Sequence, residues 1–146
     1  MKSKLLYSLF AITILASGCM GGKNNPTPVN YPSGTFTGQF RLIHTNLLTG
    51  KHDTSAANIQ LTMSTATGYQ VTGDTSTLHA GSKGAYAINA GYIDFQDATL
   101  PKTGTPKKTH LNGTYEYYYD GSSVFQMIPA SSTDTLALQY DLKKTN

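Results

Sequence analysis

The sequence predicts an all-β domain, a single antiparallel up-and-down β-barrel of about eight strands, with a β-sandwich as the alternative. From Gly34 onward, apolar residues recur with a period of two, which is typical of strands that bury one face. Thr and Tyr are frequent and glycines separate the segments, as in strands joined by turns. No segment carries an apolar stripe over three helical turns, so a parallel sheet with crossover helices is excluded.

The chain begins with the pattern of a secretory signal. Lys2 and Lys4 precede a predominantly apolar run from Leu5 to Leu15, and three small residues follow that run. A helix that spans a membrane needs about 20 apolar residues, so this run is too short for a permanent membrane helix. We therefore expect residues 1–18 to be a signal peptide that is removed.

The residues around the expected cleavage site, Leu-Ala-Ser-Gly-Cys at 15–19, resemble the lipobox of bacterial lipoproteins, with Ala16 where Leu is commonest. The resemblance implies that Cys19, the only cysteine, becomes the first mature residue and carries fatty acyl chains such as palmitate. Met20 stands where Asp would signal inner-membrane retention in enteric bacteria, so the resemblance favours an outer-membrane anchor. An ordinary signal peptide that is cut near a cysteine is the alternative.

Residues 19–33 form a predicted linker, and residues 34–146 form the predicted domain. The linker is rich in Pro, Gly and Asn and has few apolar side chains, so it cannot bury enough surface to fold. The 128 residues that remain after cleavage suit one domain and are too few for a TIM barrel. They carry nine Lys or Arg against eight Asp or Glu, which argues against the dense basic surface that nucleic acid requires.

The expected strands follow one another at close spacing. The clearest is Ala57–Ser64, where apolar residues alternate with polar ones. Asp120-Gly121, between two such segments, is a strong hairpin signal, whereas residues 46–53 and 98–109 are expected to be longer polar loops. The predicted strands are residues 35–45, 57–64, 69–72, 85–90, 92–97, 110–120, 123–128 and 135–142, with a weak ninth piece at 77–80.

Short sequential strands must hide their edges, and closure into a barrel removes the edges completely. The first strand carries Gly-Thr-Phe-Thr-Gly-Gln-Phe, in which Gly38 allows a sharp bend. With this strand and the closing Leu-Gln-Tyr-Asp-Leu-Lys-Lys at 138–144, the chain resembles small lipocalin-like (calycin-type) lipoprotein barrels. The resemblance covers residues 34–144 and implies a barrel of the kind that holds a small ligand.

Two functions are expected of such a barrel. The first is binding of an apolar or amphipathic small molecule inside it, because phenol rings offer apolar walls with polar tips. The residues expected to line this site are Phe36, Phe40, His44, Tyr115, Tyr117 and Tyr119. The second is a protein-interaction or inhibitor module that contacts another envelope protein through loops 46–53 and 98–109. Small lipoprotein barrels that block secreted proteases or lysozymes resemble this second design.

The sequence predicts neither an enzyme nor a cofactor site. The four histidines lack the His-x-x-x-His or Glu-x-x-His spacing of metal sites, so no metal is expected. The sequence has no Gly-x-Ser-x-Gly elbow and no Gly-rich phosphate loop. Lys102, Lys107 and Lys108 share one loop, where we expect them to be solvated or to contact anionic lipid head groups.

Overall fold

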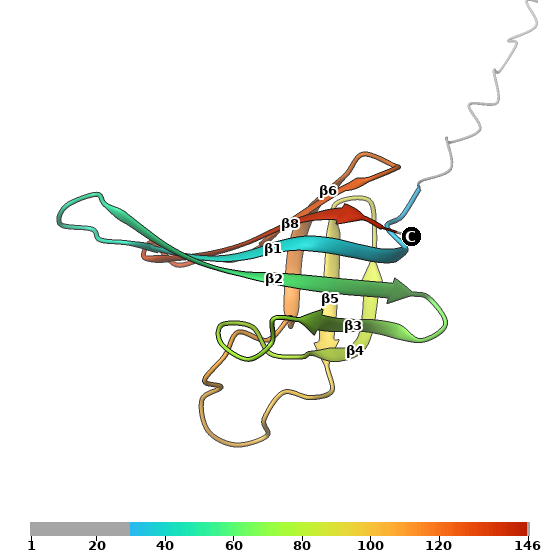
Figure 1. Ribbon diagram of the computed structural model, residues 1–146, viewed down its shortest axis with the longest axis horizontal. Coiled ribbons are helices and arrows are strands. Elements are labelled where there is room, and N and C mark those ends of the chain that lie inside the picture. The colour runs from blue at the N-terminus through green and yellow to red at the C-terminus, as the bar shows by residue number, and fades with distance from the viewer. Residues whose placement is uncertain (1–29, 146) are drawn as a thin grey trace, which may run out of the picture.

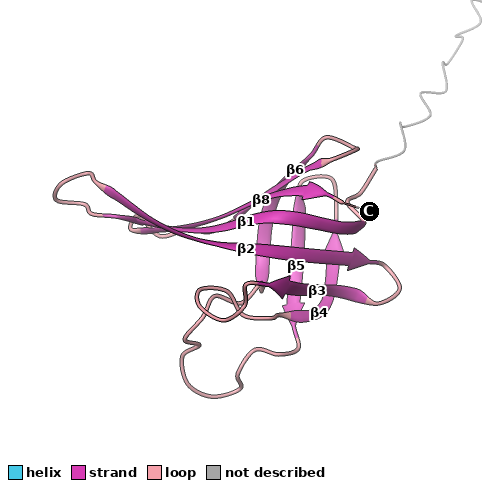
Figure 2. Ribbon diagram, in the orientation of Figure 1, coloured by secondary structure: helices cyan, strands magenta, loops and turns pink. Residues whose placement is uncertain are grey.

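The structure is a closed barrel of antiparallel strands that follow one another in chain order (Figures 1 and 2). This computed structural model describes residues 30–145; the predicted signal peptide, Cys19 and the linker up to residue 29 lie outside the described residues. β8 pairs with β1 and closes the sheet, which confirms the barrel over the sandwich. The described part of the chain contains no helix that is long and apolar enough to cross a membrane. The strands are β1 (Gly34–Thr45), β2 (His52–Ser64), β3 (Gly68–Gly73), β4 (Lys83–Ile88), β5 (Tyr92–Asp97), β6 (Gly113–Tyr119), β7 (Val124–Pro129) and β8 (Leu136–Lys144).

Alternation sends one face of each strand into a single core. On β2, the side chains of Ala57, Ile59, Leu61 and Met63 are at most 3% exposed, as the sequence pattern predicts. Burial of a side chain the size of Leu or Ile contributes about 1.5–3 kcal/mol, so the core is the main source of stability. The other core residues are Phe36, Phe40, Tyr69, Val71, Ile93, Phe95, Leu111, Tyr115, Phe125, Met127, Tyr140 and Leu142.

Two segments differ most from the sequence prediction, whereas the ends of the other strands lie within three residues of their predicted positions. β2 begins at His52, earlier than expected, because backbone pairing with β1 holds residues 52–56 although all of them are exposed. The predicted ninth piece at 77–80 forms no strand, and within it only His79 makes a bridge, to Thr109. In both places backbone pairing, and not an alternating pattern of burial, decides the local structure.

Gly38 lies on β1 at the seam where β1 and β8 close the barrel, opposite Leu142. A Cβ atom at this position would overlap the backbone carbonyl of Asp141. Glycine is therefore required by the close approach of two backbones, which is one of the usual reasons for glycine inside a strand.

The two ends of the barrel differ, because connections in a sequential antiparallel barrel alternate between the ends. One end, here called the loop end, holds the longer connections at residues 46–51, 74–82, 98–112 and 130–135. The other end, the turn end, holds the short turns at residues 65–67, 89–91 and 120–123. The chain also enters the barrel at the turn end (Figure 1), where the side-chain N–H of Asn30 donates to Gly121 O at 2.7 Å.

The hairpin of β1 and β2 extends beyond the barrel at the loop end, and the start of β8 runs beside it (Figure 1). We call residues 41–56 together with 136–139 the β arm. The β arm is a three-stranded sheet in the order β2, β1, β8, and it is continuous with the barrel wall.

A compact turn forms the tip of the β arm. The side-chain oxygen of Asn46 accepts the backbone N–H groups of Leu48 at 3.0 Å and Thr49 at 3.1 Å. Gly50 adopts a φ of 67°, which glycine tolerates better than other residues. These interactions fix the turn, so it presents Leu47 and Leu48 to solvent in a defined conformation.

Candidate functional site

Three of the residues expected to line a ligand cavity are packed core residues. Phe36 and Phe40 are fully buried, and Tyr115 is 2% exposed. The ring centroid of Phe36 lies 5.0 Å from that of Phe125, and the centroid of Phe40 lies 5.1 Å from that of Tyr140. Tyr115 packs edge-on against Tyr140 with the centroids 5.6 Å apart. Aromatic side chains therefore fill the part of the interior where these three residues lie.

The other three expected lining residues lie in different places. Tyr117 and Tyr119 are half-buried near the turn end, where their hydroxyls donate to Asn89 O at 2.8 Å and Ser122 O at 3.4 Å. His44 is exposed on the β arm. The six candidates are thus distributed over the core, the turn end and the β arm.

His79, which the sequence did not single out, is fully buried inside the barrel at the loop end. Its Nδ1 lies 2.6 Å from Ala80 O, and its Nε2 lies 2.9 Å from the hydroxyl of Tyr140. Because a carbonyl can only accept, Nδ1 carries the proton and Nε2 accepts from Tyr140. Burial lowers the pKa of His79, so the imidazole is held neutral in the core.

The β3–β4 and β5–β6 connections are joined over His79 by backbone hydrogen bonds. The N–H of Thr109 donates to Leu78 O at 2.9 Å, and the N–H of Ala80 donates to Thr109 O at 2.8 Å. The buried Ser82 hydroxyl accepts the N–H of Leu111 at 3.0 Å. The two connections therefore form a cap over the interior at the loop end.

An acidic residue fixes the base of the β5–β6 connection. Asp97 accepts the backbone N–H of Thr99 at 2.7 Å and lies 2.6 Å from Nδ1 of His110. Burial alone would raise the pKa of Asp97, but the hydrogen bonds from Thr99 and His110 outweigh it and lower the pKa below its ordinary value. The Asp97 carboxylate therefore links the first and last residues of this connection.

The middle of the β5–β6 connection, residues 100–107, projects from the barrel and is almost entirely exposed (Figure 1). Lys102 and Lys107 are exposed there. Lys108 instead reaches back, and its Nζ donates to Thr75 O at 2.7 Å. Two of the three lysines of this loop are thus free to meet a partner, while the third stabilises the cap.

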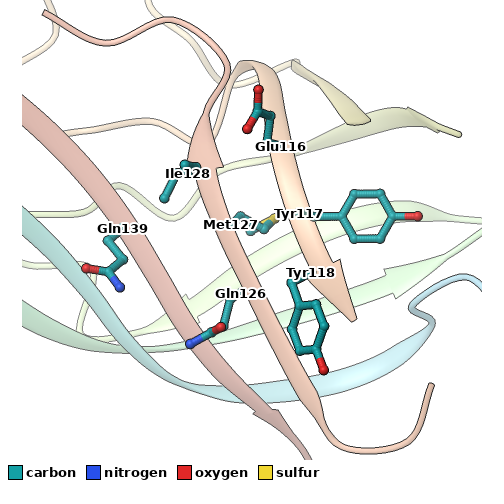
Figure 3. A pocket seen from close by; sticks show the side chains of 7 residues that line it. All are labelled: Glu116, Tyr117, Tyr118, Gln126, Met127, Ile128 and Gln139. Atoms are coloured by element: carbon teal, nitrogen blue, oxygen red, sulfur yellow. The ribbon is translucent and has the colours of Figure 1, made fainter. Parts of the chain in front are cut away.

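A recess of about 290 Å³ lies on the outer wall over β6, β7 and β8 (Figure 3). Tyr118 is 59% exposed and Ile128 is 49% exposed, so both present apolar surface to solvent. The recess is lined by Glu116, Tyr117, Tyr118, Gln126, Met127, Ile128 and Gln139. The sequence signal for this site is Tyr118, which points away from the barrel interior while Tyr117 and Tyr119 lie on the other face.

Polar groups border the recess on the β8 side. The amide of Gln126 donates to Oδ1 of Asp141 at 2.7 Å, and Nη1 of Arg41 lies 2.8 Å from Oδ2 of the same carboxylate. This surface therefore combines a phenol ring and an aliphatic side chain with amides and charged groups. Such a mixture suits a molecule that has both apolar and polar parts.

The protein is therefore an eight-stranded up-and-down barrel that has an aromatic core, a capped loop end and a projecting arm. Among residues 30–145, no three His, Cys, Asp or Glu side chains gather as they do around a metal ion. Comparison with known proteins found no family model, no curated protein and no solved structure that matches the chain.

Proposed function

We propose that the protein is a lipid-anchored lipoprotein of the bacterial cell envelope whose barrel binds another envelope protein through its loop end. The lipobox resemblance at 15–19 supports the anchor at Cys19 and an outer-membrane location. Two or more acyl chains hold a protein firmly on a bilayer, whereas one does not. The mass of the N-terminal peptide from the native host tests this part of the proposal, since an unmodified Cys19 thiol would contradict it.

The proposed interaction is based on where the longer connections lie. All four lie at the end opposite the point where the chain enters the barrel. With an anchor at Cys19, the linker would join the barrel at the turn end, which leaves the loop end farthest from the point of attachment. Binding residues are often found on loops that a rigid scaffold positions.

The side chains of the loop end favour a partner of defined chemistry. Leu47 is 66% exposed and Leu48 is 97% exposed at the tip of the β arm, and Leu100 is 37% exposed on the β5–β6 connection. Lys102 and Lys107, on the same connection as Leu100, are exposed and add positive charge there. A complementary partner has an apolar contact surface bordered by acidic side chains.

Charge reversal on the β5–β6 connection is expected to weaken this binding. A photo-reactive amino acid at Leu48 in the full chain would first capture and identify the envelope partner. Lys102→Glu and Lys107→Glu should each lower the affinity for that partner about tenfold, because each puts a negative charge against an acidic border. Lys143→Glu, at an exposed position of β8 near the turn end, is the matched control and should bind as the wild type does.

Replacement of residues 100–107 by a Gly-Ser segment gives the decisive control. If this variant and the two charge reversals all bind the captured partner with unchanged affinity, the β5–β6 connection is not part of the contact surface and the proposed contact with an acidic border is wrong.

The second candidate function is binding of an amphipathic small molecule, and the recess beside Tyr118 favours it. Its volume of about 290 Å³ is at the lower limit of ligand pockets, which are commonly about 300–1,000 Å³. The exposed ring of Tyr118 offers an apolar face, and the amides of Gln126 and Gln139 offer hydrogen bonds.

Native mass spectrometry of the full chain from its host tests this candidate. We expect a co-purifying molecule whose occupancy falls about tenfold in Tyr118→Ala, because the ring is a large exposed apolar surface in the recess. Tyr92→Ala removes a similarly exposed tyrosine outside the recess and should keep the molecule. Equal retention in both variants would place the molecule elsewhere.

A further inference from the structure

The amide of Gln126 presents its acceptor side to Tyr118 in the recess on the outer wall. Tyr118 lies opposite Gln126, and Gln126 lies opposite Asp141, so Gln126 stands in the middle of a row across β6, β7 and β8. Its side-chain N–H donates to Oδ1 of Asp141 at 2.7 Å. A carboxylate only accepts, so the amide nitrogen faces β8 and the carbonyl oxygen lies on the Tyr118 side (Figure 3).

A carboxylate lies on the same strand as Tyr118. Glu116 is exposed, belongs to the same face of β6 as Tyr118, and is paired across the sheet with Ile128. Two ion pairs occur within residues 30–145, and neither involves Glu116. Glu116 therefore adds a negative charge to the recess that no neighbouring side chain neutralises.

The guanidinium of Arg41, which lies beyond the recess on β1, is already bound. Its Nη1 lies 2.8 Å from Oδ2 of Asp141, and its Nε donates to the side-chain oxygen of Gln39 at 3.4 Å. The residues that line the recess include no Lys, Arg or His. The groups around Tyr118 thus attract positive charge, because the face of its ring does so as well.

We propose that the recess binds the ammonium group of a small organic amine, with the carbon chain of the amine against Ile128. This inference rests on the second candidate function and names the class of its ligand. The N–H groups of an ammonium would donate to the Glu116 carboxylate and to the side-chain oxygen of Gln126, and its charge would lie at the face of Tyr118. These groups extend from neighbouring strands toward the same recess (Figure 3).

Other ligand classes suit these groups less well. An anion would be repelled by the unpaired carboxylate of Glu116. A neutral alcohol could donate one hydrogen bond, but it would gain neither the attraction of Glu116 nor that of the Tyr118 ring for a positive charge. An amine with a short carbon chain uses both the charged and the apolar parts of the recess.

Binding of butylammonium and of butan-1-ol to the full chain tests the role of charge. The two probes share one carbon chain, and NMR signals of the Gln126 amide and the Tyr118 ring report their binding. We expect butylammonium to bind about tenfold more tightly than butan-1-ol, with a preference that falls as the salt concentration rises.

Phosphoethanolamine separates the two sources of an ammonium group, a free amine and a lipid head group. Its phosphate would lie close to the Glu116 carboxylate, so it should bind more weakly than butylammonium does. Tighter binding of phosphoethanolamine would instead assign the ammonium to a lipid head group.

Three variants test the residues. Glu116→Gln keeps the shape of the side chain and removes its charge, so it should weaken butylammonium binding about fourfold and leave butan-1-ol binding unchanged. Tyr118→Leu keeps an apolar side chain without the ring and should weaken butylammonium binding about threefold. Asp53→Asn removes the same charge from the β arm, outside the recess, and should bind as the wild type does. Equal affinity for both probes, unchanged in Glu116→Gln, would overturn the proposal.

The second candidate function has a separate outcome. If the recess shows no preference for butylammonium but Tyr118→Ala still loses the co-purifying molecule, the recess binds a ligand of another class and only the ammonium proposal is wrong. If Tyr118→Ala and Tyr92→Ala retain that molecule equally, the candidate function itself is wrong.

Discussion

Phe40→Ala is expected to lower the free energy of unfolding by about 3–5 kcal/mol. Phe40 is fully buried, and its ring packs against His79 at 4.9 Å and against Tyr140 at 5.1 Å between centroids. Removal of the ring would leave a cavity among side chains that cannot collapse, because β1 is held between β2 and β8. A domain of this size is commonly stable by only about 5–15 kcal/mol, so urea unfolding should show a large shift of the midpoint.

Two controls show whether this loss reports a filled interior. Ile128→Ala removes a half-exposed side chain from the outer wall and should change the stability little. An apolar cavity stays dry and takes up benzene-sized molecules, so benzene should stabilise Phe40→Ala and not the wild type. If benzene stabilised the wild type equally, space for a ligand would exist inside the native barrel, and the hypothesis of an internal ligand would gain support.

Low pH is expected to destabilise the barrel over the pH range in which His79 is protonated in the unfolded chain but neutral in the folded protein. Burial lowers the pKa of His79 in the folded protein, whereas the unfolded chain titrates near 6.5. The unfolded state therefore binds more protons below that value, and the stability falls as the pH drops from 7 toward 5. The slope is at most about 1.4 kcal/mol per pH unit for one proton. Denaturant unfolding at several pH values would measure it.

His79→Gln separates this effect from other titrations. The amide can donate to Ala80 O and accept from Tyr140, so the variant should fold, and its stability should depend less on pH between 7 and 5. Asp97 has a lowered pKa, so the stability it contributes is lost only as the pH falls below about 4. Equal acid sensitivity of the wild type and His79→Gln would contradict the assignment to His79.

Much of the barrel can be predicted from the sequence because local rules and tertiary structure agree. The alternation from Ala57 to Met63 gives both the strand and its buried face, and the Asp120-Gly121 pair gives the turn between β6 and β7. In that turn, Asp120 accepts backbone N–H groups from Ser122 and Ser123, which lower the pKa of its carboxyl to about 2. These features depend on residues close in sequence.

The remaining features depend on contacts between distant segments. Residues 52–56 show no alternation because nothing covers either face, and their strand exists only through pairing with β1. The burial of His79 follows from the joining of two connections, and its sequence neighbours give no sign of it. The recess beside Tyr118 needs the register of three strands, which no single segment encodes.

The firm base of the β5–β6 connection has a practical consequence. Asp97 and Lys108 hold the two ends of this connection in place. Gly104, between them, adopts a φ of 78° and has open space around it. Exposed tips of this kind accept inserted sequences readily. An epitope spliced in at Gly104 should leave the barrel folded, which would make this chain a scaffold for presenting foreign peptides.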